Sequence, residues 1–190
     1  MNSKHHFLIL ALSILVFMFA ATGAWASDKT PDPENTLYMD LKDGRVVIEM
    51  YPNLAPHHVA RIKELVRQGF YDGLTFHRVI EGFMAQTGCP LGNGAGGSGQ
   101  TLKSEFSNHR HYRGVCSMAR MGGDINSADS QFFIMFDKAP SLDHQYTVWG
   151  KVIKGMEYVD MIKKGDPSAN GAVKNPDHII RMQVAVDVKE

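Results

Sequence analysis

Short apolar runs that end at turn residues dominate this sequence and limit its fold more than any other feature. The last run is the clearest, because apolar residues alternate with mostly polar ones from Ile180 to Val188, as in a strand with one buried face. The other strand-like runs are 36–41, 45–51, 74–80, 83–87, 114–119, 131–136 and 146–152. Many short strands without an internal repeat favour an antiparallel sheet closed into a barrel or sandwich.

Two segments have the apolar spacing of helices. The first begins at Pro56 and ends before Gly69, a residue type common after helix C-termini. The second spans 156–164 and is followed by Gly165. Because helices do not alternate with the strands, a doubly wound fold is excluded, and we expect the two helices to cover the ends of the sheet.

The first 26 residues have the pattern of a cleavable secretory signal peptide. A positive start at Lys4 precedes the apolar stretch 7–21, and Ala24 and Ala26 are the small residues that a signal peptidase recognises. A membrane anchor is the alternative, but it needs about 20 apolar residues, more than this stretch holds. The expected organisation is a signal peptide over 1–26, a flexible leader over 27–35 and one domain over 36–190, in a periplasmic or secreted protein.

The net charge indicates neither a nucleic-acid partner nor a membrane partner. The chain has 20 Lys and Arg residues against 20 Asp and Glu residues, so we expect no nucleic-acid surface and no membrane association after signal cleavage. In an oxidising compartment Cys89 and Cys116 could form a disulfide. Two buried thiols are the preferred interpretation, because a core of this size needs no cross-link.

Three short motifs suggest other chemistry. Residues 92–97 match the glycine spacing of a dinucleotide loop, but no helical pattern follows, which favours a surface loop. His109 and His111 could be metal ligands on one face of a strand, yet no third ligand stands at a recognisable spacing. Residues 96–100 fall one glycine short of the nucleophile elbow of serine hydrolases. A metal-dependent enzyme and a serine hydrolase are therefore the weaker alternatives, and no metal is expected.

Two segments combine pocket-forming aromatic residues with polar ones. Residues 76–88 contain Phe-His-Arg-Val-Ile and Gly-Phe-Met-Ala-Gln, and residues 130–134 are Ser-Gln-Phe-Phe-Ile. An arginine paired with a carboxylate beside an ordinary core would also explain this composition. Further motifs follow in the same order: the Gly-rich loop to Gly99, Ser-Met-Ala at 117–119, Leu-Asp at 142–143 and Trp-Gly-Lys-Val at 149–152. Together, over 36–188, they resemble the cyclophilin family of peptidyl-prolyl cis–trans isomerases.

The resemblance implies a mainly β fold, a closed eight-stranded antiparallel barrel capped by two α-helices. It also implies an isomerase without cofactor or covalent intermediate that helps proline-containing, unfolded or partly folded polypeptides to fold. The implied catalytic residues are Arg78, as the donor to the proline nitrogen, Gln86 and Phe133. The implied substrate-binding residues are Phe83, Met84, Ala119, Arg120, Gln131, Leu142 and Tyr146. His77 is expected in the pocket wall, and the protein is expected to be a monomer.

Three positions depart from the best-known eukaryotic members of that family. Ser141 stands where they have a Trp, Tyr146 stands where they have a His, as in many bacterial members, and the loop 122–129 is longer. Weak cyclosporin binding and a bacterial, periplasmic setting are therefore expected. A binding or chaperone module without catalysis is the rival from another class, but it would be expected to lack Arg78 or the pocket aromatic residues.

Overall fold

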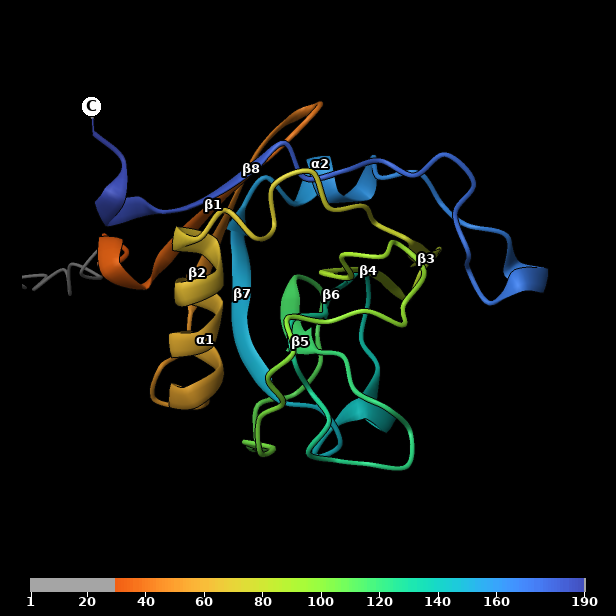
Figure 1. The fold of residues 1–190 in the computed structure, drawn as a ribbon, viewed down its shortest axis with the longest axis horizontal. Helices are drawn as coiled ribbons and strands as arrows, with labels where there is room; N and C mark the ends of the chain where they lie inside the picture. The colour runs from red at the N-terminus through yellow and green to blue at the C-terminus, as the bar shows by residue number, and fades with distance from the viewer. Residues whose placement is uncertain (1–29, 190) are drawn as a thin grey trace, which may run out of the picture. The chain divides into compact units, whose positions relative to one another are not determined.

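Within residues 30–189, eight strands pair into one curved antiparallel sheet, which Figure 1 shows for the computed structural model of the chain. The predicted signal peptide, 1–26, and the start of the leader lie outside the described residues. The strands are β1 (Thr36–Leu41), β2 (Gly44–Met50), β3 (Arg78–Ile80), β4 (Met84–Thr87), β5 (Val115–Met118), β6 (Phe132–Met135), β7 (Val148–Lys154) and β8 (Arg181–Val184). Their order across the sheet is β3-β4-β6-β5-β7-β2-β1-β8. Each predicted strand run overlaps one of these strands, which confirms a mainly β fold.

The sheet is a curled half-barrel, and the prediction of a closed barrel is wrong. The edge strands β3 and β8 do not pair. The segments before them are joined by an isolated bridge between Thr75 and His178 and by one further backbone hydrogen bond, from Gly73 N to Ile179 O at 2.8 Å. A loop already occupies the outer edge of β3: Val79 N donates to Gly171 O at 2.8 Å, and Gly165 N donates to Val79 O at 2.9 Å. Because these backbone groups are satisfied, β8 has no free ladder to join.

The first helix, α1 (Pro56–Arg67), matches its prediction. Glu105 accepts hydrogen bonds from the backbone N–H groups of His57 (3.1 Å) and His58 (3.0 Å), which satisfies two of the free donors at the helix start. Gly69 follows the helix at φ +69°, a conformation that favours glycine. The buried face of α1, which packs into the main core, consists of His58, Val59, Ile62, Leu65 and Val66.

The second helix, α2 (Met156–Asp160), is shorter than the predicted 156–164. The backbone N–H of Lys163 donates to the Asp177 carboxylate at 2.8 Å instead of continuing the helix. Gly165 N then bonds to β3. These long-range bonds draw the chain away from the helix axis, although the local apolar spacing would allow another turn.

The last strand is also shorter than its alternating pattern predicts. Pairing with β1 runs only from Asp40–Arg181 to Leu37–Val184. Met182 and Val184 are buried as expected, whereas Ile180 is 53% exposed and Val186 is 52% exposed. Alternation beyond the paired residues therefore does not bring burial, because the ladder with β1 ends at Arg181 and Val184, and a 3₁₀ turn, η4 (Ala185–Asp187), follows.

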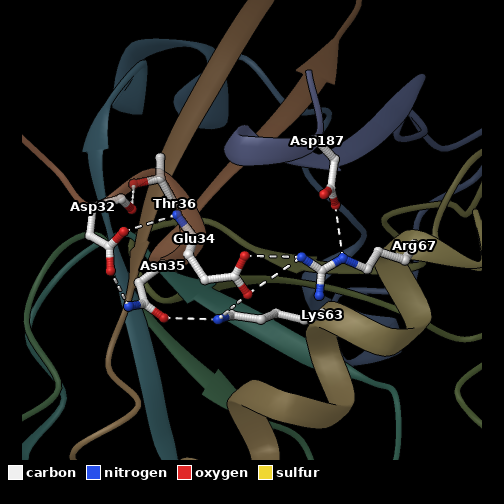
Figure 2. Close-up of polar contacts among 7 residues, drawn as sticks. All are labelled: Asp32, Glu34, Asn35, Thr36, Lys63, Arg67 and Asp187. Atoms are coloured by element: carbon white, nitrogen blue, oxygen red, sulfur yellow. Dashed lines mark hydrogen bonds and ion pairs between the residues drawn. The ribbon is translucent and has the colours of Figure 1, made fainter. Parts of the chain in front are cut away.

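A short 3₁₀ turn, η1 (Pro33–Asn35), lies at the end of the predicted flexible leader, 27–35. Asp32 caps this turn, and Figure 2 shows its polar side chains directed at α1. Lys63 Nζ donates to Glu34 Oε1 and to Asn35 Oδ1, both at 2.9 Å. The final part of the leader is thus ordered by its contacts with the helix.

Strand alternation places two apolar clusters on opposite faces of the sheet. The larger cluster packs under α1 and includes Val79, Ala85 and Ile134. The smaller cluster lies on the other face and consists of Met84, Val115, Phe133, Met135, Ala139 and Val148. No helix among the described residues is long and apolar enough to cross a bilayer.

Candidate active site

One row across the sheet carries the candidate catalytic side chains. Arg78 on β3 faces Gln86 on β4, Gln86 faces Phe133 on β6, and Phe133 faces Ser117 on β5. Residues directly opposite each other in antiparallel strands project to the same face, so these side chains are neighbours. Met84 lies two residues before Gln86 and projects to that face as well. The register therefore brings together positions up to 55 residues apart (78 to 133).

The Arg78 guanidinium contacts neutral groups only. Its Nε donates to Asn170 O at 3.1 Å, Nη2 donates to Asn170 Oδ1 at 3.0 Å, and Nη1 donates to Gln86 Oε1 at 3.2 Å. Nη1 also lies 3.8 Å from the Met84 sulfur. No carboxylate pairs with Arg78 among residues 30–189. Burial lowers the pKa of Arg78, but a guanidinium remains charged at neutral pH.

A small cavity of about 160 Å³ opens beside this guanidinium. It is lined by Arg78, Phe83, Met84, Gln86, Ala119, Arg120, Phe133, Leu142 and Tyr146. Phe133 and Tyr146 meet edge to face, with ring centroids 5.5 Å apart. The cavity is smaller than the usual 300–1,000 Å³ of a small-molecule site, so it suits one small side chain. Nine of the ten residues that the sequence singled out meet here.

The tenth residue, Gln131, lines an adjoining cavity of about 420 Å³. Its Nε2 donates to Gly94 O and Gly96 O, both at 2.8 Å, and its Oε1 accepts from Gln86 Nε2 at 2.9 Å. The glycine-rich loop is thus one wall of this second cavity, and no helix follows it. Gln86, Ala119 and Arg120 line both cavities and form the ridge between them.

Comparison with known families decides what this arrangement is. A model described as "Cyclophilin type peptidyl-prolyl cis-trans isomerase/CLD" matches residues 36–184. The chain belongs to the cyclophilin family. It is therefore an enzyme, a peptidyl-prolyl cis–trans isomerase.

Sequence relatives agree with this assignment. A probable peptidyl-prolyl cis–trans isomerase of Brucella suis is 51% identical over 195 residues, which covers 96% of this chain and 99% of the relative. Peptidyl-prolyl cis-trans isomerase B of Bacillus subtilis is 47% identical, with 69% of this chain and 92% of the relative covered.

Solved cyclophilin structures have the same fold. Cyclophilin AquaCyp293 from Hirschia baltica superimposes with a TM-score of 0.74 at 27% identity, covering 83% of this chain and 76% of that one. A Cryptosporidium parvum cyclophilin, crystallised in the presence of the dipeptide Ala-Pro, has a TM-score of 0.71 at 27% identity, covering 78% of this chain and 98% of that one.

Behind the cyclophilin pocket, three side chains form a hydrogen-bonded series that the sequence did not indicate. His111 Nδ1 lies 3.0 Å from Asp143 Oδ1, and His111 Nε2 lies 2.9 Å from Ser117 Oγ. Because the carboxylate can only accept, Nδ1 carries the proton and Nε2 accepts from Ser117. Burial lowers the pKa of His111, which keeps the ring neutral at pH 7. These hydrogen bonds connect the segment of Leu142 and Asp143, part of the pocket wall, to Ser117 on β5.

Asn170 has a role at the site that the sequence did not indicate. It lies 92 positions after Arg78 and accepts two of its hydrogen bonds. It adopts φ +52°, followed by Gly171 at φ +78°. An Asn-Gly pair is a turn signal, but a turn signal does not indicate a contact with a distant strand.

Several residues of interest in the sequence lie outside the pocket. Strand alternation over 74–80 would place Phe76 on the same face as Arg78, but Phe76 is fully buried in the main core, because β3 begins only at Arg78. His77, expected in the pocket wall, lines neither cavity, and its buried ring lies next to Gly94 of the glycine-rich loop. Cys89 and Cys116 are free buried thiols, as preferred.

His109 and His111, the candidate metal ligands, have different partners. His109 Nδ1 lies 3.0 Å from Arg110 O, and the ring packs against Tyr51. His111 belongs to the hydrogen-bonded series with Asp143 and Ser117 behind the pocket. No three His, Cys, Asp or Glu side chains are grouped to hold a metal ion within the part of the chain that the structure describes.

Proposed function

We propose that this cyclophilin accelerates X-Pro rotation by donating a hydrogen bond from Arg78 to the proline nitrogen. Unaided rotation takes tens to hundreds of seconds, because amide resonance must be lost. In the twisted transition state the nitrogen regains a lone pair, so a donor aimed at it binds this state better than either ground state. A preference of about 7 kcal/mol would accelerate rotation roughly 10⁵-fold.

The observation that carries the proposal is an arginine at the edge of a small cavity that has no carboxylate partner in the described part of the chain. Its bonds to Gln86 and Asn170 hold the guanidinium in place without cancelling its charge. Phe83, Met84, Phe133 and Leu142 would surround the proline ring and exclude water, which strengthens the contact with Arg78. The steps require no proton transfer, covalent bond or cofactor.

The substrate would be a polypeptide with an exposed X-Pro unit. The Cryptosporidium relative was crystallised with Ala-Pro, and we take an Ala-Pro unit as the smallest ligand for the 160 Å³ cavity. Ala119, Arg120, Gln131 and Tyr146 would line the path of the flanking residues. Cyclosporin should bind weakly, because Ser141, which precedes the lining residue Leu142, is exposed and offers no aromatic surface. The protein would act as a monomer.

We further propose a role in the folding of exported proteins, most simply in a bacterial periplasm. This proposal rests on the signal-peptide pattern of 1–26, whose residues lie outside the described structure. Exported protein that begins at Ser27 would support it, and exported protein that retains Met1 in the membrane fraction would contradict it.

An exchange measurement tests the isomerase proposal. NMR of an Ala-Pro peptide gives the cis–trans rate directly, without a coupled protease. Purified protein at catalytic concentration should raise this rate strongly, and the acceleration should persist in EDTA and in a thiol reductant. A rate equal to that without protein would refute the proposal and favour a binding module with the cyclophilin fold.

A further inference from the structure

A second arginine stands on the ridge between the two cavities. The Arg120 side chain donates from Nε to Gln145 O at 2.9 Å and from Nη1 to Met121 O at 2.9 Å. Its guanidinium carbon lies 4.8 Å from the centre of the Tyr146 ring. The charge of Arg120 is therefore fixed over a residue that lines the proline cavity.

No described carboxylate compensates this charge. Arg120 forms no ion pair with residues 30–189, and its Nη2 makes no hydrogen bond there. By contrast, Arg45, Arg61, Arg67 and Arg113 each pair with an Asp or Glu. Both arginines of the pocket, Arg78 and Arg120, thus keep a positive charge available to a ligand.

Asp129 is the one acidic residue that lines either cavity. Its Oδ1 accepts from the backbone N–H and the hydroxyl of Ser98, and its Oδ2 accepts from Gly99 N at 2.8 Å. These three donors direct the carboxylate into the glycine-rich loop. The ridge itself, formed by Gln86, Ala119 and Arg120, thus carries one positive charge and no carboxylate, although the whole chain carries no net charge.

We infer that this cyclophilin selects X-Pro segments with an acidic side chain within two residues of the proline, and that the Arg120 guanidinium recognises it. The inference rests on the proposed function, because a proline in the small cavity brings its neighbours to the ridge that Arg120 shares with the second cavity. A carboxylate there would accept a hydrogen bond from Arg120 Nη2, and the positive charge of Arg78 would add to the attraction.

Matched peptides test this inference. Blocked peptides based on Ala-Pro carry Glu or Gln, which have nearly the same size, at one of the positions −2, −1, +1 or +2 relative to proline. NMR exchange gives kcat/KM for each peptide with wild type, Arg120→Gln and Arg181→Gln. Arg181 is exposed on β8 and lies outside both cavities, so its variant controls for the loss of one positive charge.

At low salt we expect wild type to prefer Glu over Gln by about two- to fivefold at one or more positions, the scale of an exposed ion pair. About 0.5 M NaCl should reduce the ratio. Arg120→Gln should bring the ratio to about one, whereas Arg181→Gln should keep it. The ratio compares two peptides with the same enzyme, so a general loss of activity does not affect it.

Two results would overturn the inference: no Glu preference in wild type at any position, or a preference that survives Arg120→Gln. Turnover of the Gln peptides would then show that the isomerase proposal itself holds. No turnover of any peptide by wild type would instead refute the proposed function, and the inference with it.

Discussion

Arg67 and Arg78 show two uses of the same side chain. Arg67, in the last turn of α1, donates from Nε to Asp187 Oδ2 at 2.8 Å and from Nη2 to Glu34 Oε2 at 3.1 Å, so it joins both ends of the described chain to the helix (Figure 2). Within residues 30–189, Arg78 bonds to neutral groups only. The hydrogen bond to Asp187 raises the pKa of Arg67, whereas burial lowers that of Arg78.

The different partners of the two arginines explain why the charge of Arg67 supports the fold and the charge of Arg78 can act on a substrate. Two nearby carboxylates cancel most of the field of Arg67, so it can contribute to stability and little else. Amide oxygens orient Arg78 and leave its charge to act on a bound ligand. Substitution of Arg78 should therefore reduce mainly turnover, whereas substitution of Arg67 should reduce mainly stability.

The largest expected effect is the loss of turnover in Arg78→Ala. Removal of one preorganised donor costs about 10²–10³-fold in rate. The lost bonds to Asn170 and Gln86 should lower the free energy of unfolding by only about 1 kcal/mol. NMR exchange and urea unfolding on the same sample measure both quantities. Near-normal turnover by a folded Arg78→Ala protein would contradict the proposed role of Arg78 in catalysis.

A carboxylate at position 86 would make Arg78 resemble Arg67. In Gln86→Glu the new charge would lie where Gln86 Oε1 now accepts from Arg78 Nη1 at 3.2 Å. We expect kcat/KM to fall about tenfold as the positive charge is compensated. Gln86→Met, which also loses the amide bond to Gln131 but adds no charge, is the control. A Glu variant as active as the Met variant would argue against a role for the uncompensated charge.

Arg67→Ala should have the opposite signature. Loss of its contacts with Glu34 and Asp187 should lower the free energy of unfolding by about 1 kcal/mol, the upper range for exposed ion pairs. Because Arg67 lies outside both cavities, kcat/KM should not change. Arg181→Ala removes an exposed arginine that forms no ion pair with the described residues, so it should leave stability almost unchanged. Reduced turnover with unchanged stability in Arg67→Ala would contradict the structural role given to Arg67.

The smallest expected effect is a pH dependence at the N-terminal turn. The hydrogen bond from Lys63 lowers the pKa of Glu34, so folding favours the charged carboxylate. Wild type should exceed Glu34→Gln in unfolding free energy by roughly a few tenths of a kcal/mol at pH 7. This difference should shrink as pH falls through the lowered pKa of Glu34 and vanish below it. A difference that persists at pH 2 would mean that charge is not its cause.

Local pattern was sufficient for much of the fold. The run 114–119 contains β5, and Pro56 and Gly69 bound α1, because strand alternation and helix termini depend on residues close in sequence. The length of α2 and of β8 was overestimated. Both errors arose where bonds to distant residues, Asp177 for Lys163 and β1 for β8, decide where an element ends.

The sequence by itself determined that the protein is mainly β and that it is a cyclophilin with Arg78, Gln86 and Phe133 in its pocket, because ordered motifs and local periodicity are properties of the chain alone. Tertiary structure alone decided that the sheet stays open at β3 and that Asn170, rather than a carboxylate, holds Arg78. The reason is physical: backbone and guanidinium donors bind whatever acceptor the fold brings near, and sequence separation does not indicate which one that is.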